Sequence, residues 1–485
     1  MEEKKVVKAK KKSKNIIGIS LGILLLIITI SFINLIKMLN IIPDNYFLYG
    51  TITISFITLI IIAFLFIKSK NIVLKVIKAI CYILAICLIG IYSFGTYYLN
   101  KTMNFIDNIS IMNEEITNYY IIVLDTSKYQ ESSDLYGQTL AYFENTDTEV
   151  INSIKLNLTY TTTNDINALK DKLFKQEVES ILISDIIKNK LEEDYIDFTE
   201  NIRVLETISI KNQIEDITKK VSIKNTPFNV LISGIDAYGN INQTSRNDVN
   251  IIATINPNTN EIILTSIPRD YYVQLHGTTG YKDKLTHASY YGINMQVQTI
   301  EDIFDIDINY YVKVNFSTVV ELVDELEGIE VYADQAVNLG TNCNIKKGYN
   351  KVDGACALRF SRERHSYSDG DRHRGRNQQE VIKAIFNKVS NAPTLIGEYT
   401  NILNVLDGKF ATNMDMNEVL NLVKYEVNDL KNYHIESIQV DGYGAMGETY
   451  SYPYEKLWIM IPYEDTINEA KTLINKSLNN ESIKK

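Results

Sequence analysis

Arginine is scarce in this 485-residue chain and unevenly placed. Nine arginines stand among 40 lysines, and six of the nine fall in the 18 residues from Arg359 to Arg376. A solvated charged face is the ordinary reading of a charge run, but in this chain lysine supplies surface positive charge. The planar guanidinium group binds two phosphate oxygens at once, which an ammonium group cannot do. The cluster therefore favours a binding site for a phosphorylated ligand.

Two aspartates stand where such a ligand would need a cation. Asp236 directly follows the apolar run 228–235, and Asp248 directly precedes the apolar run 249–255. Ligands of open α/β sheets bind at strand ends, so the two carboxylates can converge there. A pair of carboxylates with phosphate oxygens and water is a usual magnesium site. A turn or helix-cap role for Asp248 is the alternative that the sequence leaves open.

Short strands are expected to position these side chains. The runs 228–235, 249–255 and 262–267 are β-branched and almost wholly apolar, as buried central strands are. The turn 256–260 (NPNTN) joins the last two strands as a hairpin. Arg269–Asp270 follow the third strand and bring further charge to a strand end.

The remaining pattern alternates helices with strands. A strand is expected at 310–314, and helices at 295–304, 317–326, 355–362 and 377–389. This alternation predicts an α/β fold, with a three-layer α/β/α domain over residues 223–478 and a polar tail at 479–485. Residues 100–222 mix strand-like and helical stretches and carry only Arg203, which predicts a small accessory α/β domain.

Three apolar runs, 16–36, 46–67 and 79–99, contain no charged residue. Each is long enough for a helix to cross about 30 Å of hydrocarbon. The first run is too long for a cleaved signal peptide and has no small-residue cleavage site after it. Residues 16–99 therefore predict three transmembrane helices behind a basic tail at 1–15.

Lysines set the expected orientation. Seven lie in residues 1–15 and four flank the second connection, so the N-terminus is predicted to be cytoplasmic and everything after Leu99 extracellular. The expected location is thus the cell membrane, with several spans. The extracellular part has 28 lysines and nine arginines against 56 acidic residues, a net charge of −19, which argues against nucleic acid as a partner.

The four cysteines divide by location. Cys81 and Cys87 lie in the third apolar run, whereas Cys343 and Cys356 lie in the expected extracellular part, where thiols oxidise. The latter pair would close a 14-residue loop, and we predict a disulfide there. The sequence has no CxxC pair and no HExxH motif, so a zinc site is not expected.

Five stretches of this chain resemble the LytR–CpsA–Psr proteins of Gram-positive cell envelopes, in matching order and spacing. They are NVLISGIDAYG (229–239), TSRNDVNIIATINP (244–257), TSIPRDYYV (265–273), KDKLTHASYYG (282–292) and FSRERHSYSDGDRHRGRNQQ (360–379). The capsule-type branch, which also has three spans and an accessory domain, is the most similar.

The resemblance implies a magnesium-dependent phosphotransferase. Such enzymes move a glycopolymer from a polyprenyl pyrophosphate carrier to peptidoglycan, where it is held by a phosphodiester. Asp236 and Asp248 would hold Mg²⁺, and Asp371 and Asp270 are the candidates for a general base. The residues that would surround the pyrophosphate are Arg246, Arg269, Arg362, Arg364, Arg374 and Gln378, of which Arg269, Arg362 and Arg364 would act in catalysis.

Two other functions remain open from the sequence. A lipid-pyrophosphate hydrolase would use water in place of the sugar hydroxyl. A non-enzymatic regulator of envelope assembly would bind the lipid pyrophosphate without turnover, although simple anion binding needs no pair of aspartates. Analysis of the product separates the three.

Overall fold

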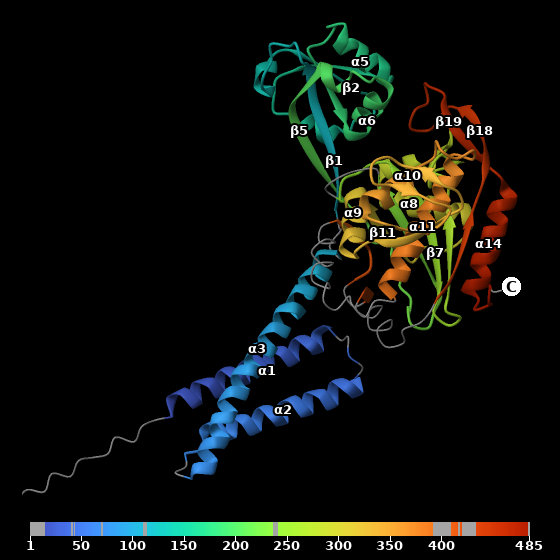
Figure 1. The fold of residues 1–485 in the computed structure, drawn as a ribbon. Coiled ribbons are helices and arrows are strands. Elements are labelled where there is room, and N and C mark those ends of the chain that lie inside the picture. The colour runs from blue at the N-terminus through green and yellow to red at the C-terminus, as the bar shows by residue number, and fades with distance from the viewer. Residues whose placement is uncertain are drawn as a thin grey trace, which may run out of the picture. The chain divides into compact units, whose positions relative to one another are not determined.

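The computed structural model describes residues 15–39, 42, 44–68, 71–109, 114–235, 241–390, 409–415, 418–419 and 433–483. It begins with three long apolar helices, α1 (Ile16–Leu39), α2 (Asp44–Phe66) and α3 (Ile72–Ile109) (Figure 1). Each is long and apolar enough to cross a membrane, which confirms the three predicted spans. Contacts group these helices separately from residues 107–416 and 430–485, which form a second compact unit.

The first part of the second unit is built on a five-stranded sheet. Its strands are β1 (Glu114–Leu124), β2 (Thr139–Phe143), β3 (Thr159–Thr163), β4 (Ser180–Ser184) and β5 (Ile202–Gln213), in the order β3-β2-β4-β1-β5. Helices α4 (Thr148–Ser153), α5 (Ile166–Phe174) and α6 (Asp185–Asp194) accompany it. Separate apolar clusters, one around Leu169 and one around Leu140, make up its core. We call this part the accessory domain.

The larger part contains a six-stranded mixed sheet. Its strands are β6 (Phe228–Ile235), β7 (Asn247–Asn256), β8 (Glu261–Ser266), β11 (Tyr310–Asn315), β16 (Phe410–Thr412) and β17 (His434–Gln439), in the order β16-β11-β6-β7-β8-β17. The predicted hairpin between β7 and β8 is present and antiparallel. The pairs β11–β6 and β17–β8 are parallel, whereas the edge pair β16–β11 is antiparallel. Buried β-branched residues on these strands explain why the runs fold as central strands.

Helices form two packed groups with this sheet, as the three-layer prediction requires. Helices α7 (Leu285–Ala288), α8 (Ile293–Phe304) and α14 (Glu464–Leu478) share a core with Leu231 and Ile252 of the sheet. Helices α9 (Phe316–Glu325), α10 (Gly354–Arg362) and α11 (Asp371–Ser390) form a second core around Phe360. Four two-stranded ladders complete the unit: β9 (Tyr272–Val273) with β10 (Asp283–Lys284), β12 (Ile329–Ala333) with β15 (Gly348–Val352), β13 (Val337–Asn338) with β14 (Asn344–Ile345), and β18 (Gly442–Gly447) with β19 (Leu457–Pro462).

Helix α11 begins earlier than the sequence pattern indicated. The predicted start was Asn377, but the helix starts at Asp371, whose carboxylate suits the first turn of a helix. Gly375 explains how this turn packs, because a Cβ there would lie 2.6 Å from Nε2 of Gln439 and 3.0 Å from Oγ of Ser266. The arginines between 371 and 377 therefore lie on a helix held closely against β8 and β17, and not on a loop.

Candidate functional site

A bulge in β7 presents Asp248. Ile235 pairs with Asn247 and Gly234 pairs with Val249, so Asp248 is an extra residue between two paired ones. Bulges redirect side chains and are frequent beside active sites. Gly234 makes this possible, since a Cβ at that position would lie 2.7 Å from the Cβ of Val249. Asp248 thus lies within the strand, rather than in a turn or helix cap.

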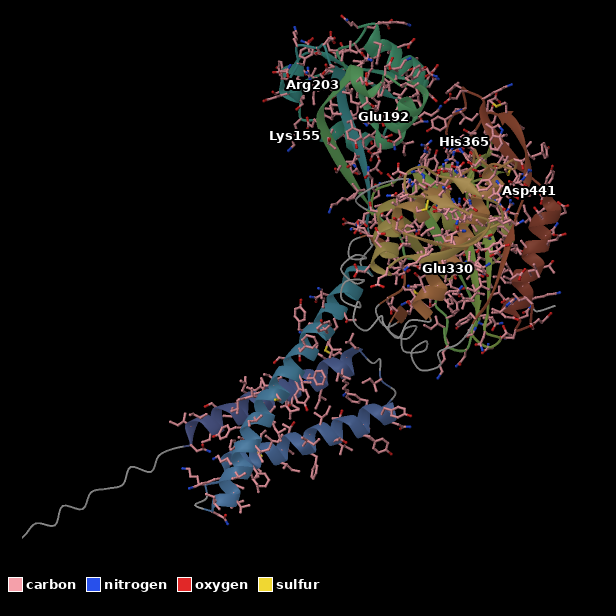
Figure 2. All side chains as sticks on the ribbon, viewed as in Figure 1. Lys155, Glu192, Arg203, Glu330, His365 and Asp441 are labelled. Carbon is pink, nitrogen blue, oxygen red and sulfur yellow. A yellow bond between two sulfur atoms is a disulfide. The ribbon has the colours of Figure 1, made fainter. Side chains whose placement is uncertain are left out.

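Five of the six predicted phosphate-binding residues line one open cleft of about 660 Å³. They come from four places in the chain: Arg246 precedes β7, Arg269 follows β8, Arg362 and Arg364 stand at the end of α10, and Arg374 lies on α11. Asp248 also lines the cleft. The cleft residues that the sequence analysis did not single out for this role are Asn338, Leu339, Leu358, Arg359, Glu363 and His365, the last labelled in Figure 2.

Two of the cleft residues, Asp248 and Arg269, form an ion pair. Nη1 of Arg269 lies 2.6 Å from Oδ1 of Asp248, and both side chains are largely buried. Burial by itself would raise the pKa of Asp248, but the guanidinium groups of Arg269 and then Arg374 outweigh it and hold the pKa below its usual value. Asp248 is therefore a stable anion among cations, which is the charge state that a metal ligand needs.

Arg362 connects the cleft to a narrower, apolar pocket. Its guanidinium carbon lies 4.2 Å from the centre of the Phe316 ring, a cation–π contact. Apolar side chains form much of the neighbouring pocket, which the polar residues Asp248, Asn315, Ser361, Arg362, Arg374 and Gln378 also line. The apolar lining residues are Ile235, Val249, Val314, Phe316, Val319 and Leu358. Gln378, the sixth predicted phosphate residue, thus belongs to this pocket and not to the open cleft.

The two candidate bases differ in their partners. Asp371 lies 2.6 Å from Nη2 of Arg374, and burial raises its pKa despite that partner, with Asp270 adding to the rise. Asp270 is paired with Lys284 at 2.9 Å and lies 3.5 Å from Nε of Arg269. Neither aspartate is among the described residues that line the cleft. Asp371 is the better candidate, since a raised pKa brings a carboxylate nearer to the proton affinity that a base requires.

Three of the clustered arginines have structural partners. Arg359 donates to the carbonyl oxygens of Leu339 and Thr341, both at 3.0 Å, and so holds the β13–β14 turn at the cleft edge. Arg372 binds Asp441 and the carbonyl of Gly442. Arg376 binds Asp369 and does not line the cleft. Of the arginines between 359 and 376, Arg359, Arg362, Arg364 and Arg374 therefore line the cleft, whereas Arg372 and Arg376 do not.

Cys343 and Cys356 form a disulfide, with Cα atoms 5.3 Å apart. The bond joins the segment beside β14 to the first turn of α10. Both cysteines are buried in the core around Phe360. Because α10 ends at Arg362, this crosslink fixes the start of the helix that carries a cleft residue.

The predicted magnesium ligands can be compared with the structure only in part. Asp236 lies outside the described residues, as does all of 236–240. Within the described ranges, no three His, Cys, Asp or Glu residues gather as a metal site. The donor chemistry nevertheless fits magnesium, which proteins hold with one or two carboxylates while phosphate oxygens and water supply the rest.

Comparison with known proteins identifies the family. The model of the LytR_cpsA_psr family matches residues 198–460. Two relatives are named polyisoprenyl-teichoic acid–peptidoglycan teichoic acid transferases. TagU of Bacillus cereus is 32% identical over 229 residues, covering 47% of this chain and 73% of TagU. TagT of Bacillus subtilis is 34% identical over 227 residues, covering 44% and 68%. A crystal structure of B. subtilis TagV, at 28% identity, covers 53% of this chain and 98% of TagV with a TM-score of 0.44.

The chain therefore belongs to the LytR–CpsA–Psr family, as its five sequence stretches indicated. The matched region contains the cleft and the apolar pocket beside it.

Proposed function

We propose that this protein is a membrane-anchored phosphotransferase that moves a glycopolymer from a polyprenyl pyrophosphate to peptidoglycan. The observation that carries the proposal is the convergence of six arginines on one cleft that opens beside an apolar pocket. A pyrophosphate with a long lipid tail has both matching parts. The relatives TagU and TagT are named as transferases that use a polyisoprenyl-linked teichoic acid and peptidoglycan.

The chemistry follows from the charges of the cleft. A hydroxyl oxygen of the peptidoglycan sugar forms a bond to the phosphorus nearest the glycopolymer, and the bond from that phosphorus to the bridging oxygen breaks. The lipid monophosphate leaves with the electron pair. Arg269, Arg362 and Arg364 neutralise the charge that grows on the phosphoryl oxygens, which is the main requirement of phosphoryl transfer. Asp371 is the proposed acceptor of the hydroxyl proton.

Asp248, with Asp236, is the proposed magnesium site. When bound, Mg²⁺ would neutralise phosphate charge and orient the pyrophosphate. Asp248 fits this role because the arginines keep it ionised at the point where cleft and pocket meet. The ion pair with Arg269 also sets the orientation of the carboxylate.

The apolar pocket is the proposed site of the first isoprene units. Phe316, Val319 and Leu358 lie on α9 and α10, and Val249 and Val314 come from the sheet. Their burial against a lipid would release water from apolar surface, which favours binding. Arg246, Arg374 and Gln378 complete the proposed shell around the pyrophosphate.

We also propose that the N-terminus is cytoplasmic and that the sheet domains are extracellular. Lysines flank the helix ends expected on the cytoplasmic side. The disulfide in the large unit fits the oxidising outer location. Labelling of an introduced cysteine at Ser13 and at Ser482 in intact cells tests this, because only the second should react with an impermeant reagent.

A product analysis tests the main proposal. The purified full chain is mixed with a polyprenyl-pyrophosphate-linked glycan, peptidoglycan and Mg²⁺, and phosphorus NMR follows the products. Transfer gives a phosphodiester to peptidoglycan. A free phosphorylated glycan would instead indicate a hydrolase, and an unchanged donor that still binds would indicate a regulator. The Val319→Trp variant narrows the apolar pocket at a residue that does not line the open cleft. It should weaken binding of the lipid donor but not of inorganic pyrophosphate.

A further inference from the structure

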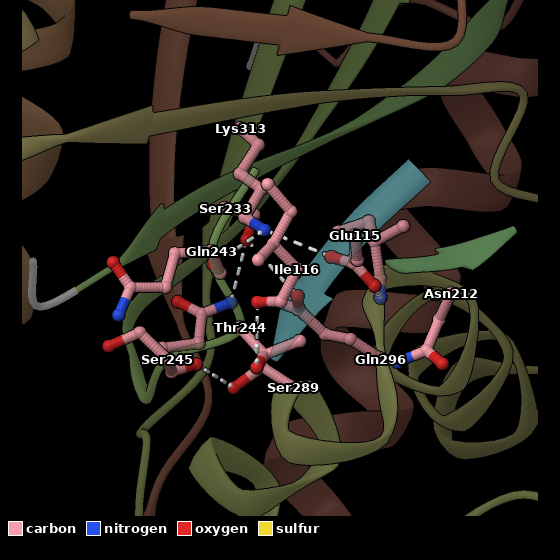
Figure 3. A network of polar contacts seen from close by, with 12 residues as sticks. Glu115, Ile116, Asn212, Ser233, Gln243, Thr244, Ser245, Ser289, Gln296 and Lys313 are labelled. Carbon is pink, nitrogen blue, oxygen red and sulfur yellow. Dashed lines mark hydrogen bonds and ion pairs between the residues drawn. The ribbon is translucent and has the colours of Figure 1, made fainter. Parts of the chain in front are cut away.

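The first residues of β1 pair with β5 along one edge and with the segment 242–244 of the larger part along the other edge. The N–H of Ile116 donates to the carbonyl of Asn242 at 2.8 Å, and the N–H of Thr244 donates to the carbonyl of Ile116 at 2.9 Å. Ile116 and Gln243 thereby form a parallel bridge (Figure 3). The segment 241–246 belongs to no strand of the six-stranded sheet, so this bridge supplies backbone partners that the sheet does not.

Buried side chains reinforce the bridge from both sides. The hydroxyl oxygens of Thr117 and Thr244 lie 3.2 Å apart, and the hydroxyl of Ser289 donates to the carbonyl of Ser245 at 2.7 Å. All four residues are buried. Buried hydrogen bonds of this kind fix a conformation, because a broken one leaves a polar group without water.

A buried ion pair also holds the start of β1 against the larger part. Nζ of Lys313 on β11 lies 2.9 Å from the carboxylate of Glu115, and both residues are buried. The same ammonium group lies 3.4 Å from the carbonyl of Gln243, and the N–H of Ile293 donates to Glu115 at 3.1 Å. Gly292 provides the space that the Glu115 carboxylate occupies, because a Cβ at this position would lie 2.7 Å from Oε2 of Glu115. A buried pair gains little net stability after desolvation, so its clearest effect is to select one geometry.

The bridged segment leads directly into the cleft. Arg246 follows Ser245 and lines the cleft, and the next two residues are Asn247 and the bulged Asp248. Nδ2 of Asn247 donates to the hydroxyl of Ser233 at 2.8 Å, which ties the other end of the segment to β6. Arg246 therefore lies between two points at which the segment is held. One is the hydrogen bond from Asn247 to Ser233 of β6, and the other is the bridge from Gln243 to Ile116 of the accessory domain.

We propose that β1 of the accessory domain is a positioning element for Arg246, with Ile116 and Thr117 acting through the segment 241–246. The proposal rests on the phosphate-binding role proposed for the cleft and assigns a function to the accessory domain. Phosphoryl transfer depends on placement, and a displacement of about 1 Å in such a site can cost up to about a hundredfold in rate. The accessory domain would thus be required for turnover even though its other strands lie outside the site.

A double-mutant cycle tests this inference in the full chain. Ile116→Pro removes the N–H that bonds Asn242 and leaves the β5 ladder its own donors, since Ile116 directs its N–H and C=O to the segment 241–246. Thr117→Val is the milder variant, in case proline prevents folding. Each is made in the parent and in Arg246→Ala, with kcat and KM measured for the lipid pyrophosphate donor. Thermal melting is recorded beside them.

We expect Ile116→Pro to lower kcat/KM by about tenfold or more in the parent. In the Arg246→Ala background the further loss should be less than about threefold, because coupled residues are not additive. Tyr120→Phe is the matched control: it removes a hydrogen bond from β1 to Asp185 inside the accessory domain, and its rate should stay near that of the parent.

Equal losses from Ile116→Pro in both backgrounds would overturn the inference, as would a loss of the same size in Tyr120→Phe. A silent Arg246→Ala variant would overturn the phosphate role of Arg246 and the inference with it. Normal rates in both Ile116→Pro and Thr117→Val, with Arg246→Ala impaired, would overturn the positioning role and leave the proposed function intact.

Discussion

Asp248 lies 2.6 Å from Arg269, and the two residues are brought together from the start of β7 and the end of β8. The pair is a charged hydrogen bond at the place where cleft and pocket meet. It explains why an aspartate can remain ionised in a largely buried position, since its pKa is held below the usual value. It also means that the carboxylate has a fixed direction before any cation or phosphate binds.

Asp248→Asn should abolish magnesium-dependent turnover while the fold is retained. The amide keeps the shape but loses the charge that a cation and Arg269 require. Initial rates across a magnesium titration, with melting recorded in parallel, provide the measurement. Asp305→Asn is the control, because Asp305 is exposed, pairs with Lys471 and does not line the cleft. Normal rates in Asp248→Asn would remove this residue from the metal site.

Arg362→Lys and Arg364→Lys should each slow transfer by about ten- to a hundredfold, which corresponds to about 1.4–2.7 kcal/mol. Lysine keeps the charge but cannot bind two phosphoryl oxygens in one plane. Arg362→Lys also weakens the contact with Phe316. The transfer rate from a lipid pyrophosphate donor is measured, with melting as the check on folding.

Arg203→Lys supplies the comparison for those variants. Arg203, labelled in Figure 2, makes two hydrogen bonds to the carbonyls of Ser127 and Tyr129 in the accessory domain. It should affect stability more than rate. Rates within twofold of the parent for both Arg362→Lys and Arg364→Lys would mean that the cluster is not the site.

Asp371 should give the transfer rate an acidic limb. A base works only when ionised, so the rate should fall as the pH drops below the folded pKa, which burial raises above 3.8. Stability should change in the opposite sense. The folded state holds this proton more tightly than the unfolded state, so its contribution favours folding at low pH and is lost as the pH rises from the unfolded to the folded pKa.

Asp371→Asn should remove both effects. The variant should lose most of its rate at neutral pH, and the remaining rate should no longer follow that limb. The pH dependence of kcat, with melting at each pH, is the measurement. An unchanged limb in Asp371→Asn would exclude this residue as the base, and Asp270→Asn would then be the next variant to compare.

Cys343→Ser should lower the free energy of unfolding by about 3 kcal/mol, because without the crosslink the unfolded chain regains the conformational entropy of the closed loop. Both cysteines are buried in the α9–α11 core. Denaturant unfolding in detergent measures this. Cys87→Ser, which replaces an exposed free cysteine, should be nearly neutral. Transfer at low temperature should survive in Cys343→Ser, since neither cysteine lines the cleft. Equal stability of parent and variant would contradict the prediction.

Local chain chemistry was enough to predict many of the elements. Strand β6 was predicted at its observed bounds, because a short and mostly apolar run has few other ways to be buried. The three membrane helices were equally clear, since only a helix satisfies the backbone of so long an apolar run in lipid. The excess of arginine between 246 and 376 indicated a cluster, and six of those eight arginines line the cleft.

The tertiary structure decided what each of those residues does. Arg362 and Arg372 both belong to the arginine cluster between 359 and 376, yet Arg362 lines the cleft and Arg372 binds Asp441. The bulge at Asp248 depends on how β6 meets β7, and the early start of α11 depends on packing of Gly375 against Gln439. The pairing of Ile116 with Gln243 joins residues more than a hundred positions apart. Composition and periodicity report only on near neighbours in the chain, so contacts between distant segments had to come from the folded molecule.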